Sequence, residues 1–115
     1  MEENITDLNR VELRGRVGQE PRIFTSGENQ VAKFSLATSE TFHDRKGDIK
    51  EETTWHNVAA WNGKDTVNVK QIRKGALIHL TGRLRNVKYT SVEGEERHFT
   101  EIVATRLEIL KGFPS

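Results

Sequence analysis

The sequence predicts an all-β protein built as a small closed barrel, and three observations support this fold class. Apolar and polar residues alternate along several short segments, as they do in strands with one buried face. Turns that contain glycine separate these segments, and a single stretch has the residues of a short helix. The chain has 115 residues, which is enough for one domain with one core.

The first half of the chain contains three predicted strands. Residues alternate along Arg10–Val17, Val31–Thr38 and Thr54–Trp61, and the glycine within the first of these predicts a bulge or a close backbone approach. The residues expected to face inward from the first two strands are Val11, Leu13, Gly15, Val17, Ala32, Phe34 and Leu36. Val31 is expected to face outward. The stretch Phe42–Thr53 is polar and charged, so we expect a long loop there.

The second half contains a predicted helix and two further strands. Asp65 is a suitable N-cap for a short helix over Thr66–Lys74, which Gly75 ends. Leu77–Arg85 and Ile102–Leu110 are the fourth and fifth strands, and a Gly-containing acidic turn between them indicates a hairpin. The residues expected to face inward in this half are Val69, Ile72, Ile78, Leu80 and Leu84.

Five strands with one short helix between the third and the fourth describe an OB-fold, a five-stranded Greek-key barrel. We expect this domain to occupy residues 1–110, followed by a short tail at 111–115. Another small β-barrel or a β-sandwich fits the same pattern. No apolar run has the length of a membrane span, and Met1–Leu8 lacks the layout of a signal peptide, so a cytoplasmic protein is expected.

Composition and spacing argue against enzymatic and metal chemistry. The chain has no cysteine, which excludes disulfides, thiolate zinc sites and thiol nucleophiles. Its four histidines are scattered rather than paired at ligand spacing. Its adjacent carboxylates would point to opposite sides of an extended chain, so they do not form an acid/base pair. We therefore expect no catalytic activity, no metal and no cofactor.

Four aromatic residues with polar neighbours are candidates for nucleic-acid binding, namely Phe42, Trp55, Trp61 and Tyr89. Bases of a single strand stack on such rings, and each stacked base contributes about 1–3 kcal/mol. The alternative is that the two tryptophans belong to the core. Asn57 shares their face and favours exposure, but alternation alone leaves exposure and burial about equally supported.

Basic residues fall mostly on the outward faces of the predicted strands, where they could bind phosphates. The candidates from this pattern are Arg10, Arg14, Lys33, Arg83, Arg85 and Lys88. The net charge of +1 is low for a nucleic-acid-binding protein, although a neutral total is compatible with a locally positive groove. For any one of these side chains, an ordinary solvated surface is the simpler explanation.

Four stretches cover nearly the whole chain and carry a resemblance to a known family. They are Asn9–Pro21 (NRVELRGRVGQEP), Phe34–Phe42 (FSLATSETF), Glu52–Val58 (ETTWHNV) and Arg73–Tyr89 (RKGALIHLTGRLRNVKY). In these stretches the chain resembles the bacterial single-stranded DNA-binding proteins of the homotetrameric OB-fold type. The resemblance implies an OB-fold, a homotetramer and sequence-tolerant binding that protects single-stranded DNA in replication, recombination and repair.

The resemblance also implies roles for individual residues. The family's stacking aromatics fall on Phe42, Trp55, Trp61 and Tyr89, with changes of ring type at all of these except Trp55. Its phosphate-binding cations fall on Arg10, Lys74, Arg85 and Lys88, and Lys64 stands beside a position where the family has a lysine. His56 matches a histidine at the subunit interface.

Two further points bear on partners. The family usually carries a linker rich in glycine, proline and glutamine and an acidic tip that recruits replication and repair proteins. The sequence has no such tip, so the resemblance leaves that recruitment open. Two other functions remain as alternatives: a primosome-type OB protein that mainly bridges other proteins, and an enzyme built on an OB barrel, which no residue pattern supports.

Overall fold

The computed structural model describes residues 5–63, 66 and 68–111. Within them the chain forms six strands and one 3-10 turn, η1. Their bounds are β1 (Val11–Val17), β2 (Arg22–Ser26), β3 (Asn29–His43), β4 (Ile49–Trp61), η1 (Val69–Gln71), β5 (Leu77–Thr90) and β6 (Glu96–Lys111). No helix in this part of the chain is long and apolar enough to cross a membrane.

The strands form one sheet that closes on itself. Their order is β1-β5-β6-β4-β3-β2, and a further pairing of β1 with β3 joins the two sides. The neighbours β4 and β6 run parallel, and all other pairs are antiparallel. Five strands thus make a closed barrel, as the sequence predicts, while β2 adds to the free side of β3 as an extra edge strand.

Barrel closure depends on the absence of a side chain at two glycines. A Cβ at Gly15 of β1 would lie 2.2 Å from the carbonyl oxygen of Ala37 on β3. A Cβ at Gly82 of β5 would lie 2.1 Å from the carbonyl oxygen of Val103 on β6. Backbone therefore meets backbone at both places, which confirms the close approach predicted within the first strand.

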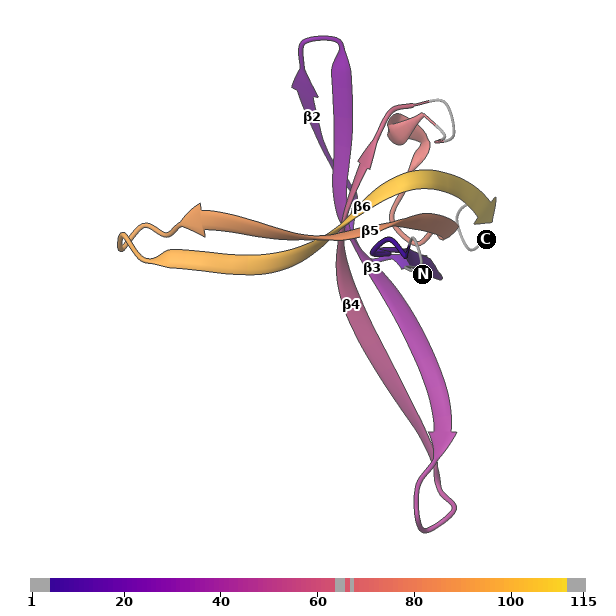
Figure 1. Ribbon diagram of the computed structural model, residues 1–115. Coiled ribbons are helices and arrows are strands. Elements are labelled where there is room, and N and C mark those ends of the chain that lie inside the picture. Colours follow the sequence, from indigo (N-terminus) through magenta and orange to yellow (C-terminus); the bar gives the residue numbers. More distant parts are fainter. Residues whose placement is uncertain (1–4, 64–65, 67, 112–115) are drawn as a thin grey trace.

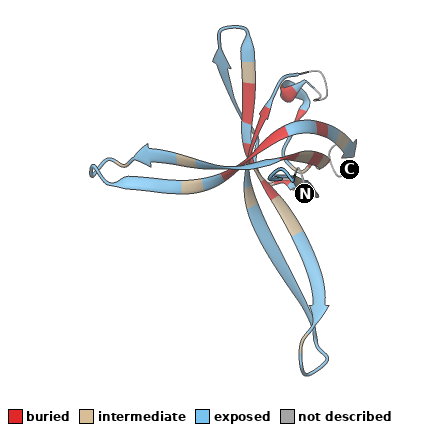
Figure 2. Ribbon diagram, in the orientation of Figure 1, coloured by how far each residue is buried: buried red, intermediate tan, exposed pale blue. Residues whose placement is uncertain are grey.

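Three hairpins extend beyond the barrel as arms, and Figure 1 shows them projecting in different directions. They are formed by β2 with β3, by the far ends of β3 and β4, and by the far ends of β5 and β6. Figure 2 shows buried residues gathered where the arms meet and exposed residues along their length. The arms thus place long stretches of backbone and side chain in water.

The prediction of a loop over Phe42–Thr53 is wrong. The strands β3 and β4 stay paired as far as His43 and Ile49, and a short turn joins them. In that turn Asp44 Oδ1 accepts hydrogen bonds from the backbone N–H groups of Lys46 and Asp48, at 2.9 Å each. This part of the ribbon is exposed on both faces, so it lacks the alternation that reveals a strand.

The predicted helix over Thr66–Lys74 is shorter than expected and is a single 3-10 turn. The side chain of Asn68 caps it by accepting from the backbone N–H of Lys70 at 3.0 Å. Thr66 instead forms isolated bridges with Gly63 and Leu107, which is extended geometry. The expected N-cap, Asp65, lies outside the described residues.

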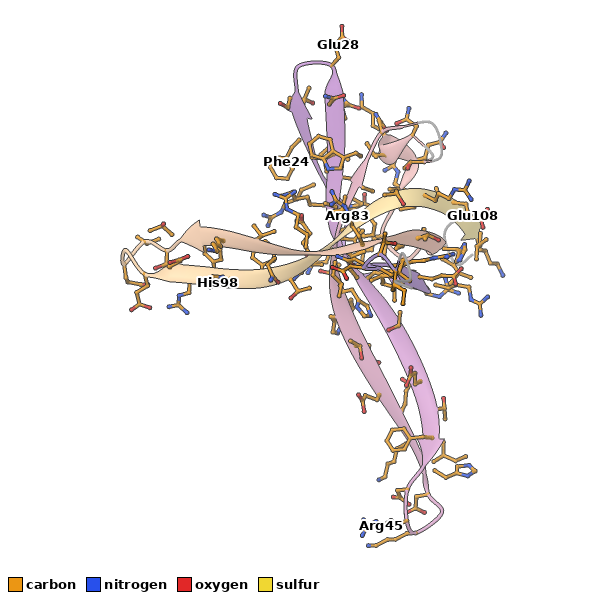
Figure 3. All side chains as sticks on the ribbon, viewed as in Figure 1. Phe24, Glu28, Arg45, Arg83, His98 and Glu108 are labelled. Atoms are coloured by element: carbon orange, nitrogen blue, oxygen red, sulfur yellow. The ribbon has the colours of Figure 1, made fainter. Side chains whose placement is uncertain are left out.

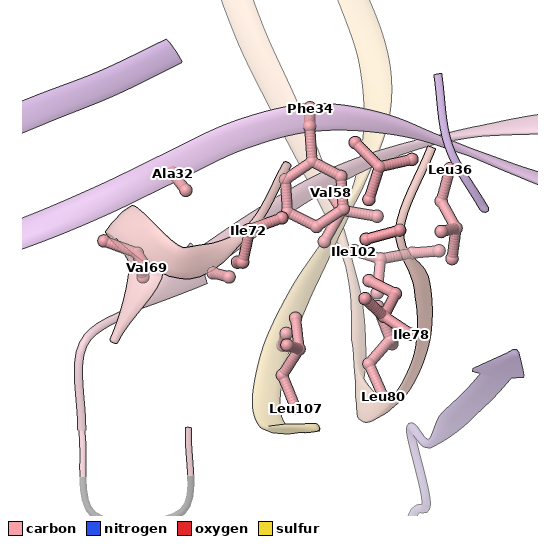
Figure 4. Close-up of a cluster of buried hydrophobic side chains, with 14 residues drawn as sticks. Ala32, Phe34, Leu36, Val58, Val69, Ile72, Ile78, Leu80, Ile102 and Leu107 are labelled. Carbon is pink, nitrogen blue, oxygen red and sulfur yellow. The ribbon is translucent and has the colours of Figure 1, made fainter. Parts of the chain in front are cut away.

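The barrel interior contains the apolar cluster that the alternation predicts, and Figure 4 shows it. Its fully buried large side chains are Leu36, Ile78, Leu80, Val58 and Val69. Val31 lies on the outer face, as predicted, but it is only 5% exposed because its cross-strand neighbours on that face are Phe24 and Trp61. One inward–outward prediction is wrong. Leu84 is 47% exposed, because it lies where β5 leaves the barrel, beyond a register shift at Thr81 and Gly82.

Candidate nucleic-acid interface

The two tryptophans lie on the outer face of β4, so the alternative that places them in the core is wrong. Trp55 is 61% exposed and Trp61 is 39% exposed. The residues of opposite parity, Val58 and Ala60, are buried in the barrel. Two rings of one strand thus face water, separated by Asn57 and Ala59 on the same face.

The Trp55 ring packs against the backbone of Gly18. A Cβ at Gly18 would lie 2.5 Å from Cζ3 of the indole, so the ring rests against backbone. The N–H of Gly18 donates to the carbonyl oxygen of Ser35 at 2.9 Å, which fixes that backbone against β3. The ring is therefore held in place from one side while its other surface stays accessible.

Cross-strand register shows which residues share this outer face. Residues directly opposite each other in a sheet point to the same side. One row runs across five strands through Arg83, Val103, Ala59, Lys33 and Arg22. Cations thus lie at both ends of a row whose centre is covered by small or apolar side chains.

The neighbouring row contains a nearly buried carboxylate. Arg85 pairs with Glu101 of β6, and Glu101 is 5% exposed. Its Oε2 lies 3.7 Å from Lys33 Nζ, and the Asn57 amide donates to the Thr100 carbonyl oxygen at 3.4 Å. Lys33, Asn57 and Glu101 border a hollow of about 260 Å³ between the β1–β2 connection and strands β3, β4 and β6.

The β5–β6 arm continues this face outward. Tyr89 has the same parity as Arg83 and Arg85, and its ring meets Phe99 edge-on with centroids 6.0 Å apart. Among the described residues, neither arginine forms an ion pair or a hydrogen bond. Figure 3 shows Arg83 where the arms meet. The arm therefore combines free guanidinium groups with an exposed ring.

The β2–β3 arm contributes an aromatic residue that sequence reasoning missed, Phe24. It pairs with Val31, which pairs in turn with Trp61, so all three lie on the same face. Phe24 is 49% exposed, and Lys33 Nζ lies 5.9 Å from its ring centroid. Its alternation with Arg22 was the available signal, but the segment is too short to reveal a strand by itself.

We call this surface the aromatic face. It comprises Arg22, Phe24, Lys33, Trp55, Asn57, Trp61, Arg83, Arg85, Tyr89 and Glu101. Rings and cations alternate along it, and all of its elements pair within one sheet. Such a surface can stack bases and bind the phosphates between them. No cluster of possible metal ligands occurs in the described part of the chain.

Other predicted site residues lie off the aromatic face. Phe42 is about half exposed, but it has the parity of the core side and pairs with Lys50 near the tip of its arm. Lys88 points away from Tyr89, with its Nζ 3.8 Å from Glu96 Oε1. Lys64 lies outside the described residues.

Lys74 and His56, the candidate interface histidine, also lie apart from the aromatic face. The backbone N–H of Lys74, which follows η1, donates to Glu20 Oε1 at 3.1 Å. His56 is partly buried, and its Nε2 lies 2.9 Å from Thr38 Oγ1. Partial burial lowers the pKa of His56 below 6.5, because it disfavours the charged ring.

Arg10, just before β1, and Arg14 of β1 lie beside His79 of the neighbouring strand β5. Arg14 pairs with His79, and Arg10 borders a hollow of about 390 Å³ beside it. The ring contacts two carboxylates, with Nε2 2.7 Å from Glu12 Oε2 and Nδ1 3.2 Å from Glu108 Oε1. Mainly through the hydrogen bond to Glu12, this arrangement raises the pKa of His79.

Comparison with known proteins places this geometry in a family. The model of the single-strand binding protein family matches residues 8–110. A single-stranded DNA-binding protein of Neisseria meningitidis is 40% identical over 107 residues, which cover 91% of this chain and 61% of that protein. The corresponding protein of Xylella fastidiosa is 35% identical over 106 residues, covering 91% of this chain and 65% of that one. The chain thus spans about three-fifths of the length of these relatives.

Two solved structures of single-stranded DNA-binding proteins have a similar fold. The Plasmodium falciparum SSB in complex with ssDNA superimposes with a TM-score of 0.76 at 33% identity, over 95% of this chain and all of that one. A deletion mutant of the single-stranded DNA binding protein from Thermus aquaticus gives 0.72 at 26% identity, over 91% of this chain and 51% of that one. The barrel, its arms and the match over residues 8–110 show that the chain belongs to the single-strand binding protein family.

Proposed function

We propose that this chain binds single-stranded DNA with little sequence preference and protects it during replication, recombination and repair. The observation that carries the proposal is the exposure of Trp55 and Trp61 on one strand, with free arginines on β2 and β5 of the same sheet. The similar Plasmodium falciparum protein was solved as a complex with ssDNA, which supports this ligand. The proposed activity is binding alone, without catalysis or a cofactor, in the cytoplasm at the nucleoid.

The aromatic face supplies the first part of the path. Bases stack on Trp55, Trp61 and Tyr89, and phosphates between them meet Arg83 and Arg85. Lys33 joins them when it exchanges its contact with Glu101 for a phosphate. The path then continues around the molecule to the remaining predicted contacts, which are Phe42, Arg10, Arg14, Lys64, Lys74 and Lys88.

The proposed assembly is a homotetramer. Strand β1 pairs with β5 over Val11–Arg16 but with β3 only at Arg16 and Val17. Most of its second edge is therefore unpaired, and a free edge of this kind is a ready site for another chain. Several barrels in one assembly would let a long strand wrap from one to the next, and His56 is proposed to lie at a contact between subunits.

The test is a titration with oligothymidylate and with duplex DNA of equal length, followed by tryptophan fluorescence. Stacking should quench emission with the single strand and much less with the duplex. Replacing Trp55 with alanine should weaken binding by about 1–3 kcal/mol, with a small effect on the melting temperature because the ring is exposed.

Affinity should also fall with rising salt, because bound phosphates release counterions. A salt-independent affinity, or equal affinity for single strand and duplex, would contradict the proposal and favour a protein-bridging module. A large loss of stability in Trp55→Ala without a binding defect would contradict the assignment of the site.

A further inference from the structure

We propose that Phe24 is an additional base-stacking residue, which extends the single-stranded DNA path from Trp61 onto the β2–β3 arm. This inference rests on the proposed function and adds a subsite to it. The ligand of that subsite is one nucleobase of the bound strand, together with its adjoining phosphate.

The register places Phe24 in line with a ring already assigned to the path. Phe24, Val31 and Trp61 are direct cross-strand neighbours on β2, β3 and β4. Adjacent strands lie about 4.8 Å apart, so the two aromatic residues are separated by roughly 10 Å of sheet. Val31 is buried between them and forms an apolar floor. The rings thus form two neighbouring platforms on one surface, each with room for a base.

The cations next to Phe24 suit the backbone of a strand that reaches this arm. Lys33 Nζ lies 5.9 Å from the ring centroid, and Arg22 pairs with Lys33 one step further along the same face. Among the described residues, Arg22 forms no ion pair or hydrogen bond. A phosphate that follows a base on Phe24 therefore meets two positive side chains.

Packing alone does not account for Phe24. The ring is 49% exposed and does not belong to the buried cluster of the barrel. Figure 3 shows it projecting from β2 beside the arm rather than into the barrel. An aromatic ring in this position contributes little to the core, whereas its accessible surface is what a base requires.

Substitutions at position 24 separate stacking from simple apolar packing. Phe24→Ala and Phe24→Leu should weaken oligothymidylate binding by about 5- to 150-fold, while Phe24→Trp should bind at least as tightly as the parent chain. Ile23→Ala is the matched control, because Ile23 is the neighbour on the opposite face of β2 and should leave affinity unchanged. Melting curves of each variant confirm that the barrel is folded.

A second measurement observes the position directly. The chain has two tryptophans, so Trp55→Phe and Trp61→Phe combined with Phe24→Trp give a single reporter at position 24. Its emission should be quenched by oligothymidylate.

The outcomes keep the two proposals apart. Phe24→Leu binding as tightly as the parent chain, or a reporter that DNA does not quench, overturns the Phe24 subsite if Trp55→Ala still weakens binding. If the parent chain itself fails to bind single strands, or if Trp55→Ala has no effect, the proposed function fails instead.

Discussion

At Trp55, a neighbouring glycine fixes the orientation of an exposed aromatic ring. Its indole lies against Gly18, whose backbone is bonded to β3, so the ring needs no apolar pocket to hold its orientation. A ring that is already oriented loses less entropy when a base stacks on it. We therefore expect the glycine and the tryptophan to act as one binding unit.

Gly18→Ala tests this unit. The added methyl group would lie 2.5 Å from the ring, so the exposed indole must move while the backbone can stay in place. We expect weaker binding to oligothymidylate, approaching the affinity of Trp55→Ala, and a small change in melting temperature. The measurement is a fluorescence titration of both single variants and the double variant. Additive losses in the double variant would show that the two residues act independently.

At the scale of elements, the sequence predicted the barrel better than the arms. Inside the barrel one face of each strand is buried, so alternation marks the strands and their inward residues, as at Leu36, Ile78 and Leu80. In the arms both faces are wet, so the far ends of β3 and β4 looked like a loop. The segment around η1 looked like a helix because Val69 and Ile72 stand three residues apart, as on one face of a helix. Both are buried as predicted, although Ile72 is the C-cap that follows the turn.

Alternation along the strands predicted only part of the candidate site. Parity separates inward from outward residues, and it correctly grouped Trp55 with Trp61 and Arg83 with Arg85. Parity does not say which side of a closed barrel an outward residue occupies. Arg14 therefore looked equivalent to the other cations, although the register places it beside His79.

The surface around His79 links three strands and gives stability a pH dependence. Glu12 of β1 and Glu108 of β6 both contact this β5 ring, and Arg10, Arg14 and Arg106 are the other charged groups around it. The raised pKa means that folding favours the protonated ring. Its stabilising effect is therefore fully present below about pH 6.5 and is lost as pH rises through the folded-state pKa.

Denaturation of the parent chain and His79→Gln across this pH range measures the effect. The parent chain should be the more stable below about pH 6.5, and the difference should shrink as pH rises. His56 has the opposite sign, since its lowered pKa removes stability as pH falls below 6.5, and it remains in both chains as an internal control. A difference that grows with pH would contradict the assignment.

At the scale of the whole molecule, the unpaired edge of β1 predicts self-association. The protomer has a mass of 13.1 kDa, and we expect light scattering to give about four times that mass at micromolar concentration. The free edge over Val11–Gly15 would be covered by another copy of the chain. A mass equal to one protomer across the concentration range would refute the prediction.

The division into a barrel and three arms also implies a gradient of local opening. The barrel strands share the buried cluster, whereas the arm hairpins have exposed side chains on both faces. Hydrogen bonds in such hairpins break and re-form without unfolding the barrel, so their amide protons exchange with solvent much sooner. The molecule therefore combines a stable barrel with arms that open locally. Such arms can adjust to a flexible polymer whose backbone follows a different path each time it binds.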